Sequence, residues 1–229
     1  MTDPLSGPDQ DRNPPVSAAE RFRTPVPVYH VGYHPPHLAR HSGYDPITRW
    51  IGEPIALSRP MYWTGETLLR VPAKLISWYG GSFEYSRHDF VMECQVVIHM
   101  LQRECCIYHF VHGEKSFKML SHLANLRGHQ LIATIHHPES HFRWLFRSTH
   151  HLRTLAHATV VSRSQLEFLS KIMGADKVSF VPYGIDTDYF IPPTIRPPTT
   201  KRRCLFAGYH MRDFETLRKV VQNTVAHHP

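Results

Sequence analysis

Apolar segments of strand length alternate with helical segments from residue 105 to residue 184, and this alternation constrains the fold more than any other feature of the chain. Strands separated by helices of about 10–15 residues indicate βα units, which build parallel sheets. Several of the segments are apolar throughout, as is typical of strands covered by helices on both faces. We therefore expect an α/β fold with a doubly wound parallel sheet. The expected strands are 105–113, 129–138, 157–164 and 177–184, and the expected helices are 114–128, 139–156 and 164–174.

The sequence before residue 105 gives a less regular pattern. We expect strands at 26–34 and 73–81 and a helix at 88–103, where the apolar residues have helical spacing. A long stretch rich in Pro and Gly separates the first two of these elements, and loops of that length are often functional. Residues 1–24 are rich in Pro, Asp and Ser, which predicts a disordered N-terminal segment. The lobe built on the sheet is thus expected to span residues 25–192.

The end of the sequence predicts a second, incomplete lobe. Residues 193–202 are rich in Pro and basic residues and are typical of a linker. In 203–229 an apolar run, Cys204 to Ala207, leads to Gly208 and then to a helical pattern that starts near Phe214. A strand, a glycine turn and a helix form the opening unit of a nucleotide-binding α/β domain.

Composition narrows the functional classes. The chain has 229 residues and a formal net charge of +7, and a basic surface attracts phosphates, nucleic acid or anionic lipid. We find no helix-turn-helix, RNA-recognition or zinc-finger pattern, so we do not expect a nucleic-acid partner. The sequence has no membrane-spanning run and no apolar N-terminal signal. Its four cysteines have no framework spacing, so we expect reduced thiols and a cytoplasmic location, with peripheral membrane contact open.

The stretch from 133 to 214 resembles the retaining glycosyltransferases of family 4. The family motif V-P-N-G-[IV]-D-x-x-x-F has its counterpart at 181–190, where Tyr183 stands in place of the usual Asn. The segment after Leu205 resembles the first strand and glycine turn of the family's donor lobe. The resemblance implies a two-lobed GT-B fold, in which a Rossmann-like N-terminal lobe binds the acceptor and the C-terminal lobe binds a nucleotide diphosphate sugar.

The resemblance also sets an expectation about activity. Family members carry two glutamates, seven residues apart, deep in the donor lobe, whereas Glu215 is the only glutamate after Gly208 in this sequence. We therefore expect these 229 residues alone to lack the donor site and to be inactive. A complete relative would transfer a hexose from a nucleotide diphosphate sugar to an acceptor with retention of configuration, and we expect neither a cofactor nor a metal ion.

Three residues at the expected strand ends are candidates for the cleft. His136 ends the strand "LIATIH", and since ligands bind outside the carboxyl ends of parallel strands, we identify it as the candidate catalytic residue. The family often has a histidine there, near the transferred sugar. His109 and Ser162 are candidate cleft residues at the ends of two other strands, while Ser164 with Glu167 is expected to form a capping box. The spacing of Cys105, Cys106, His109 and His112 could suggest zinc, but residues three apart on a strand point to opposite faces.

Loops and the second lobe supply further candidates. Gly80 and Gly81 follow an expected strand and would let the backbone approach an acceptor closely. Tyr44 and Asp45 are polar groups in the long loop that could contact the acceptor. Gly208 and Arg212 correspond to the family's donor-phosphate turn, where a helix N-terminus favours an anion. We expect these last two residues to be vestigial in the printed sequence.

The expected helix at 139–156 has one further surface. Its apolar stripe includes Phe142 and Leu145, whereas Arg143, Trp144 and Arg147 fall outside the stripe. Basic residues around an exposed Trp suit an anionic membrane surface, although a plain solvated face has the same composition. A non-catalytic module that binds a glycan, a lipid headgroup or a partner protein remains the alternative to a glycosyltransferase.

Overall fold

The fold was analysed in a computed structural model, which describes residues 26–32, 52–55, 69–80, 85–114, 116–184, 186–192, 206 and 213–227. Several sequence predictions lie outside these ranges. They are the disordered segment 1–24, the linker 193–202 and the candidate residues Tyr44, Asp45, Gly81, Gly208 and Arg212.

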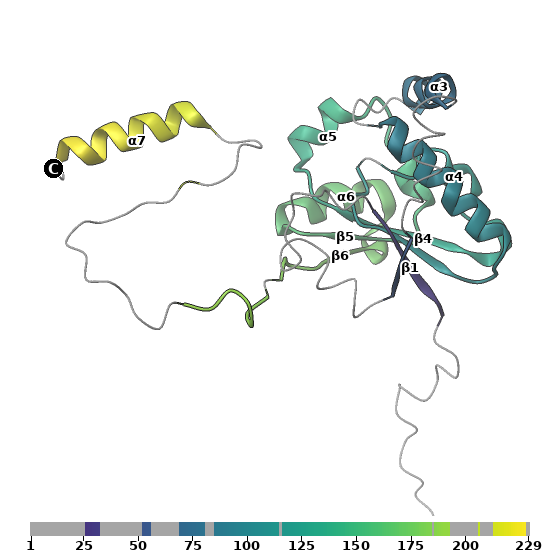
Figure 1. Cartoon of the computed structure of the whole chain (residues 1–229). Helices are drawn as coiled ribbons and strands as arrows, with labels where there is room; N and C mark the ends of the chain where they lie inside the picture. The colour runs from purple at the N-terminus through teal and green to yellow at the C-terminus, as the bar shows by residue number, and fades with distance from the viewer. Residues whose placement is uncertain are drawn as a thin grey trace, which may run out of the picture. The chain divides into compact units, whose positions relative to one another are not determined.

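Six parallel strands form one sheet in the order β2-β1-β3-β4-β5-β6. Figure 1 labels four of them, β1, β4, β5 and β6, together with the helices. Every neighbouring pair is parallel and in regular register; His30 on β1, for example, lies beside His109 on β3. The sheet confirms the predicted parallel α/β class and adds one strand, β2, that the sequence analysis missed. The strands are β1 (Val28–Val31), β2 (Glu53–Ile55), β3 (Ile107–Phe110), β4 (Gln130–Ile135), β5 (His157–Val160) and β6 (Val178–Phe180).

Helices and short 3-10 segments connect the strands. Two of the helices, α4 and α6, lie where the sequence predicts helices, and α4 begins at a capping box formed by Ser86 and Asp89. The helices are α3 (Arg70–Gly80), α4 (Arg87–Leu101), α5 (Glu139–Leu145), α6 (Leu166–Met173) and α7 (Phe214–His227). The 3-10 segments are η2 (Leu120–Leu123), η3 (Leu126–Gly128), η4 (His150–Thr154), η5 (Arg163–Gln165) and η6 (Ala175–Lys177).

The prediction of a strand at 73–81 is wrong, because this segment belongs to helix α3. Ala73 is buried against Tyr85 and Phe90, and Ile76 and Leu69 pack on the same cluster. Residues 69, 73 and 76 are three and four positions apart, which is the spacing of one helix face rather than of one strand face. The aromatic and β-branched composition of "LISWY" suggested a strand, and packing against α4 outweighs that preference.

Two predicted helices are shorter than expected. In 114–128 the chain forms η2 and η3 instead of one α-helix, since Phe117 (φ 58°) and Arg127 (φ 52°) adopt left-handed backbone conformations that no α-helix accommodates. In 139–156, α5 ends at Leu145 because Phe146 is extended (φ −122°, ψ 126°). Phe142, Leu145 and Phe146 are all buried, so this short turn inserts three large apolar side chains into the core.

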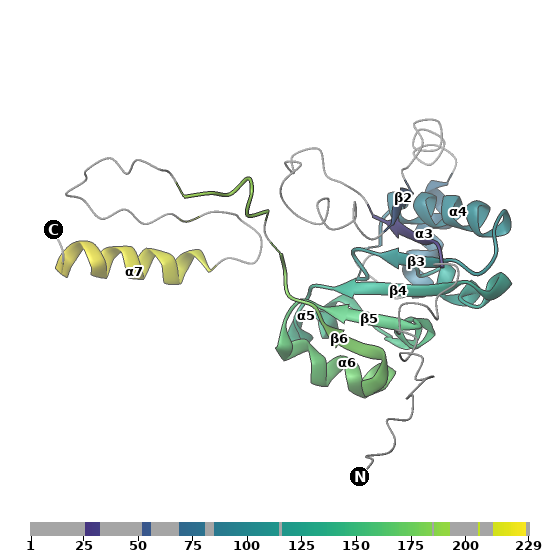
Figure 2. The same cartoon turned by 90° about the horizontal axis from the view of Figure 1, so that it is seen from below.

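The main core lies on one face of the sheet. Tyr29, Val31, Tyr108 and Phe110 point into it, and so do the corresponding alternate residues of β4, β5 and β6. Within the described ranges, α4, η2, α5, η4 and α6 all pack on this face, so the helices expected on both faces of a doubly wound sheet are not seen there. Figure 2 looks onto the sheet, in which the labelled strands β2, β3, β4, β5 and β6 follow one another across the view. Burial of this apolar surface is the main source of stability for such a layered fold.

The residues from Ile191 onward form a separate compact unit, because the chain divides into Met1–Phe190 and Ile191–Pro229. Helix α7 confirms the helix expected after Gly208. Asp213 starts it by accepting hydrogen bonds from the backbone and side chain of Thr216 (2.9 and 2.6 Å), and Glu215 pairs with Lys219 one turn further on (2.9 Å). None of the helices in the described ranges has the length and hydrophobicity that crossing a bilayer requires.

Candidate functional site

The carboxyl ends of β1, β3 and β4 meet at one edge of the sheet. The sheet order changes direction between β1 and β3, because β2 follows on one side of β1 and β3 on the other. Ligands of open parallel sheets bind in the crevice at such a point. Gly113 is needed there, since a Cβ on it would lie 2.7 Å from Ile135 Cδ1 and 2.8 Å from Ala133 Cβ. We therefore take this carboxyl edge as the candidate site.

His136 lies at this edge, as the sequence predicts, and its two ring nitrogens have different environments. Nε2 is 2.8 Å from the carbonyl oxygen of Val111, so it must carry the proton and donate it. Nδ1 is then an acceptor, and it receives a hydrogen bond from the hydroxyl of Tyr183. Burial lowers the pKa of His136, with the Val111 carbonyl acting in the opposite direction. The imidazole is therefore neutral at pH 7, with a defined tautomer.

Tyr183 gives the unusual residue of the 181–190 motif a structural partner. Its ring lies 5.7 Å from the His136 ring, although the two residues are 47 positions apart. Burial, together with the nearby Glu114 carboxylate, raises the pKa of Tyr183 to about 12. The hydroxyl thus remains protonated at neutral pH and acts as a donor to His136.

Glu114 holds the loop after β4 in place. Its side chain is only 2% exposed, and Oε1 accepts hydrogen bonds from the backbone N–H groups of His136 and His137, the second at 2.8 Å. Gln165 supports the same loop by donating to the carbonyl oxygens of His137 (2.9 Å) and Ile135 (3.3 Å). The sequence analysis missed both residues, although an acidic residue just after a strand is a signal that could have drawn attention to Glu114.

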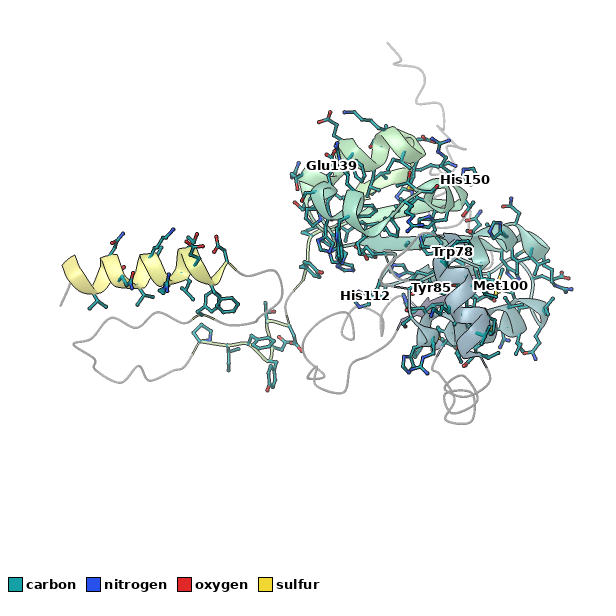
Figure 3. All side chains as sticks on the ribbon, turned by 90° about the horizontal axis from the view of Figure 1, so that it is seen from above. Trp78, Tyr85, Met100, His112, Glu139 and His150 are labelled. Carbon is teal, nitrogen blue, oxygen red and sulfur yellow. The ribbon has the colours of Figure 1, made fainter. Side chains whose placement is uncertain are left out.

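His112 adds a second imidazole to the edge. Its ring centroid lies 5.1 Å from that of His136, on the turn that follows the neighbouring strand. Figure 3 labels it at the margin of the sheet. The edge therefore presents two imidazoles and a phenol within one small region, and these groups suit hydrogen bonding to hydroxyl-rich molecules.

His109, in contrast, lies on the sheet surface rather than at its edge. It bonds His30 (Nδ1–Nδ1 3.1 Å) and Thr134 (Nε2–Oγ1 2.8 Å), and Thr134 continues to Thr159 (2.8 Å). Burial and the neighbouring His30 lower the pKa of His109 to about 4. These four side chains cross four adjacent strands on the face opposite the main core. His109 is therefore placed to fix strand register, and the structure does not bring it together with His136.

Ser162 begins the η5–α6 segment instead of lining a cleft. It is exposed, its Oγ accepts from Ser164 N (3.4 Å), and its own N–H donates to Gln165 Oε1 (2.8 Å). The predicted capping box of Ser164 and Glu167 is thus wrong: the box is formed two residues earlier, by Ser162 and Gln165. Glu167 pairs with Lys171 instead (2.6 Å), where both groups are exposed and contribute little.

The remaining sequence candidates are dispersed. Gly80 is the last residue of helix α3, so it does not follow a strand. Arg143 pairs with Glu139 (2.7 Å), and Trp144 is 62% exposed beside the His141 ring. Arg147 lies beyond the end of α5, so the three residues do not form the continuous helical face that was expected.

A buried set of titratable groups lies away from the edge, under α4. Glu93 is fully buried and accepts from the backbone N–H groups of Lys118 (3.0 Å) and Leu120 (2.6 Å). Burial raises the pKa of Glu93 to about 7 and lowers that of Lys118 to about 7. Lys118 Nζ lies 2.7 Å from His151 Nε2 and 4.0 Å from the centre of the Phe146 ring. This cluster faces the core and serves the fold.

We find no set of metal ligands in the part of the chain that the structure describes. No three His, Cys, Asp or Glu side chains there are grouped closely enough to hold an ion. His109 and His112 belong to different environments, as described above, which separates the members of the Cys-Cys-His-His pattern.

Searches with this chain against protein-family models, curated proteins and solved structures find no match. The functional interpretation therefore rests on the motif residues and on the geometry of the edge.

Proposed function

We propose that this chain forms the acceptor-binding part of a retaining glycosyltransferase with a two-lobed, GT-B-type fold. The six-stranded parallel sheet, the change of direction between β1 and β3, and the polar groups at the carboxyl edge support the proposal. In this view residues 26–192 bind the acceptor, and the unit that contains α7 is the beginning of the lobe that binds a nucleotide diphosphate sugar.

The observation that carries the proposal is the hydrogen bond between Tyr183 and His136. The two residues belong to different parts of the resemblance: His136 ends a strand where the family often has a histidine, and Tyr183 stands at the motif position that the family usually fills with Asn. They meet at the edge where a parallel sheet binds its ligands. A shared site is the simplest reason for two distant motif positions to contact each other there.

The chemistry of this edge suits a carbohydrate. His136 is neutral, its Nε2 proton is committed to Val111, and Nδ1 is held as an acceptor of an O–H group. The phenolic hydroxyl of Tyr183 occupies the position that a sugar hydroxyl would take. Glu114 and Gln165 fix the backbone of His136 and His137, so the imidazole is oriented before a ligand arrives, which lowers the entropic cost of binding.

In the complete two-lobed enzyme, the acceptor hydroxyl would be positioned against the sugar carbon of the donor. Orientation and electrostatic stabilisation of the departing diphosphate would then supply most of the rate. His136 would contribute by accepting a hydrogen bond from a sugar hydroxyl and holding it in one orientation.

Carbohydrate binding by the full 229-residue chain tests the proposal. A labelled sample is applied to an array of hexosides and oligosaccharides, and hits are measured by titration calorimetry. We expect retention on a subset of glycans and a loss of about tenfold or more in affinity for His136→Ala, because the acceptor of the ligand's hydrogen bond is removed. His150→Ala, at an exposed histidine (Figure 3), is the matched control. No retained glycan, or equal binding by both variants, would contradict the proposal.

A non-catalytic binding module is favoured by one specific observation. Both ring nitrogens of His136 are engaged within the chain, by Val111 and Tyr183, so the imidazole binds nothing unless Tyr183 withdraws. Incubation with UDP- and GDP-hexoses and an array-selected acceptor separates the two functions. Because the 229 residues alone are expected to lack the donor site, transfer is assayed with the chain fused to the donor lobe of a family 4 enzyme. Hexose transfer that is lost in His136→Ala favours the enzyme, whereas glycan binding without transfer by the fusion under any donor favours the module.

A further inference from the structure

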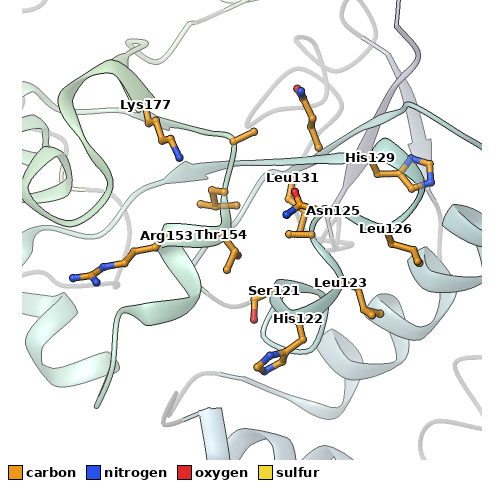
Figure 4. A pocket seen from close by; sticks show the side chains of 14 residues that line it. Ser121, His122, Leu123, Asn125, Leu126, His129, Leu131, Arg153, Thr154 and Lys177 are labelled. Atoms are coloured by element: carbon orange, nitrogen blue, oxygen red, sulfur yellow. The ribbon is translucent and has the colours of Figure 1, made fainter.

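A hollow of about 590 Å³ lies at the opposite edge of the sheet, where β4 and β5 begin (Figure 4). Its lining includes Leu131, the second residue of β4, and Leu155, which precedes β5, both 1% exposed, and the half-buried Leu123 and Leu126 form its apolar floor. Its walls come from η2, η3, η4 and η6. The proposed carbohydrate site uses the carboxyl ends of the strands, so this hollow is a separate feature and owes nothing to the proposed function.

The charged side chains that line the hollow are both basic. Arg153 and Lys177 line it, and no aspartate or glutamate is among its lining residues. Among the described residues, neither of these two cations has an ion-pair or hydrogen-bond partner for its side chain, in contrast to Arg127, which pairs with Glu104 at 2.6 Å. Figure 4 shows the Lys177 ammonium directed toward the hollow, whereas the exposed Arg153 side chain extends outward from its rim, so two positive charges lie beside a concave surface whose lining has no carboxylate.

The ends of the 3-10 segments account for the position of these cations but do not neutralise them. Arg153 lies in the last turn of η4 and Lys177 ends η6, positions where a basic residue complements the helix dipole. Even a long helix carries only about half a unit charge at its end, and these segments have a single turn or little more. The net local field therefore remains positive.

Neutral groups complete the lining. Asn125 is exposed, and its amide can donate two hydrogen bonds to a ligand. Thr154 donates its hydroxyl proton to the carbonyl of His151 (2.7 Å), which leaves its oxygen as an acceptor toward the hollow. The leucines of the floor offer an apolar surface of the kind that binds a ring or an alkyl group. Volumes of about 300–1,000 Å³ are usual for sites of small molecules.

From these features we propose that the hollow binds a small organic phosphate monoester. The phosphate, which carries nearly two negative charges at neutral pH, is bound at Lys177, and the exposed Arg153 side chain turns inward to meet it, because a guanidinium and an ammonium together match that charge. The organic part lies on Leu123 and Leu126, and Asn125 donates to an oxygen of the ligand.

Titration calorimetry with phenyl phosphate, inorganic phosphate and benzyl alcohol tests this assignment on the full chain. We expect phenyl phosphate to bind about tenfold or more tightly than either of the other two probes, since only it uses both the cations and the apolar floor. Arg153→Gln and Lys177→Gln should each weaken binding about tenfold or more, as expected for loss of a charge-assisted hydrogen bond. Asn125→Asp should abolish binding by placing a negative charge in the lining.

The control is Lys74→Gln on helix α3, which removes one positive charge from an exposed position outside the hollow. Equal weakening by Lys74→Gln would show that the phosphate responds only to net charge, and would overturn the assignment. If inorganic phosphate binds as tightly as phenyl phosphate, the organic part adds nothing to the affinity, and the assignment of a phosphate monoester is overturned. No heat of binding with any probe at millimolar concentration would overturn it entirely. Circular dichroism of each variant verifies that the fold is retained.

Discussion

The two edges of the sheet differ in how their polar groups are used. At the carboxyl edge, the His136 ring bonds Tyr183, and Glu114 and Gln165 bond the backbone of the loop that carries His136 and His137, so these groups have partners within the chain. At the amino edge, Arg153 and Lys177 surround a hollow without any carboxylate in its lining. The comparison teaches that a concave surface and the best-organised polar cluster need not coincide: the polar groups of the carboxyl edge are bonded within the chain, whereas the cations of the amino edge face no carboxylate in the lining.

The largest expected effect is on the internally bonded edge. Glu114→Ala removes the acceptor of two backbone N–H groups, those of His136 and His137. Leaving a buried donor unsatisfied costs about 1–3 kcal/mol, so we expect the free energy of unfolding to fall by about 3 kcal/mol. Urea denaturation measures it. Glu114→Gln keeps one acceptor oxygen and should lose about 1 kcal/mol. An unfolding free energy for Glu114→Ala within about 0.5 kcal/mol of the wild type would show that these bonds do not hold the edge.

The second prediction concerns Lys118, which is buried next to the amino-edge hollow. Its backbone carbonyl oxygen accepts a hydrogen bond from the hydroxyl of Ser121 (2.7 Å), and Ser121 lines the hollow. Its folded pKa of about 7 lies below its value of about 10.5 in the unfolded chain. The unfolded state therefore binds more protons between pH 7 and 10.5, and this contribution to stability rises with pH across that window. Relative to Lys118→Met, we expect the wild type to gain on the order of 2 kcal/mol from pH 7 to pH 10.

Denaturation of both proteins at several pH values measures this gain, and Lys74→Met serves as an exposed control. A difference between wild type and Lys118→Met that stays constant with pH would show that the Lys118 ammonium is not desolvated in the folded protein.

A smaller effect, on carbohydrate affinity, tests whether the hydrogen bond within the carboxyl edge competes with a ligand. Tyr183→Phe removes the hydroxyl that competes with a sugar for His136 Nδ1. A neutral hydrogen bond contributes about 1 kcal/mol, so carbohydrate affinity should rise roughly fivefold. Calorimetry with an array-selected glycan measures the change, and Tyr189→Phe in the same segment is the control. A fall in affinity would mean instead that Tyr183 contacts the sugar or positions the imidazole.

The smallest effects are expected at the amino edge. Arg153→Gln and Lys177→Gln should change the free energy of unfolding by less than about 0.5 kcal/mol, because neither cation has an ion-pair partner among the described residues. Arg127→Gln is the contrast, since Arg127 donates to the Arg103 carbonyl (2.9 Å) and to Glu104. A loss above 1 kcal/mol for Lys177→Gln would show that this cation serves the fold rather than a ligand.

The parallel sheet could be predicted because the alternation of apolar and helical segments is local. Helix α3 could not, because "LISWY" has strand composition, and its contacts with α4 decide its conformation. Strand β2 has three residues, one of them Pro54, and lies in a stretch that otherwise predicts loop. The break at Phe117 had no signal either, since a left-handed backbone at a phenylalanine is set by tertiary packing.

The candidate site, like the fold, could be predicted only where the signal is local in the sequence. His136 was found because the end of a parallel strand faces the ligand-binding edge. Its partners Glu114 and Tyr183 are 22 and 47 positions away, and Gln165 is 28 positions from His137. Such contacts follow from the path of the chain in space, which periodicity does not specify. His109 was placed at the edge because strand ends are uncertain by a residue or two, and one residue changes the face.

Nitrogen-15 NMR of the histidine rings tests the central claim, that His136 Nδ1 is the carbohydrate-binding acceptor of the carboxyl edge. In the free chain we expect a neutral His136 ring with the proton on Nε2. Methyl hexosides should then move the Nδ1 signal of His136 and leave His122, in the lining of the amino-edge hollow, unchanged. Phenyl phosphate should do the reverse. A His136 ring that no hexoside perturbs, or hexosides that move both rings equally, would contradict the account.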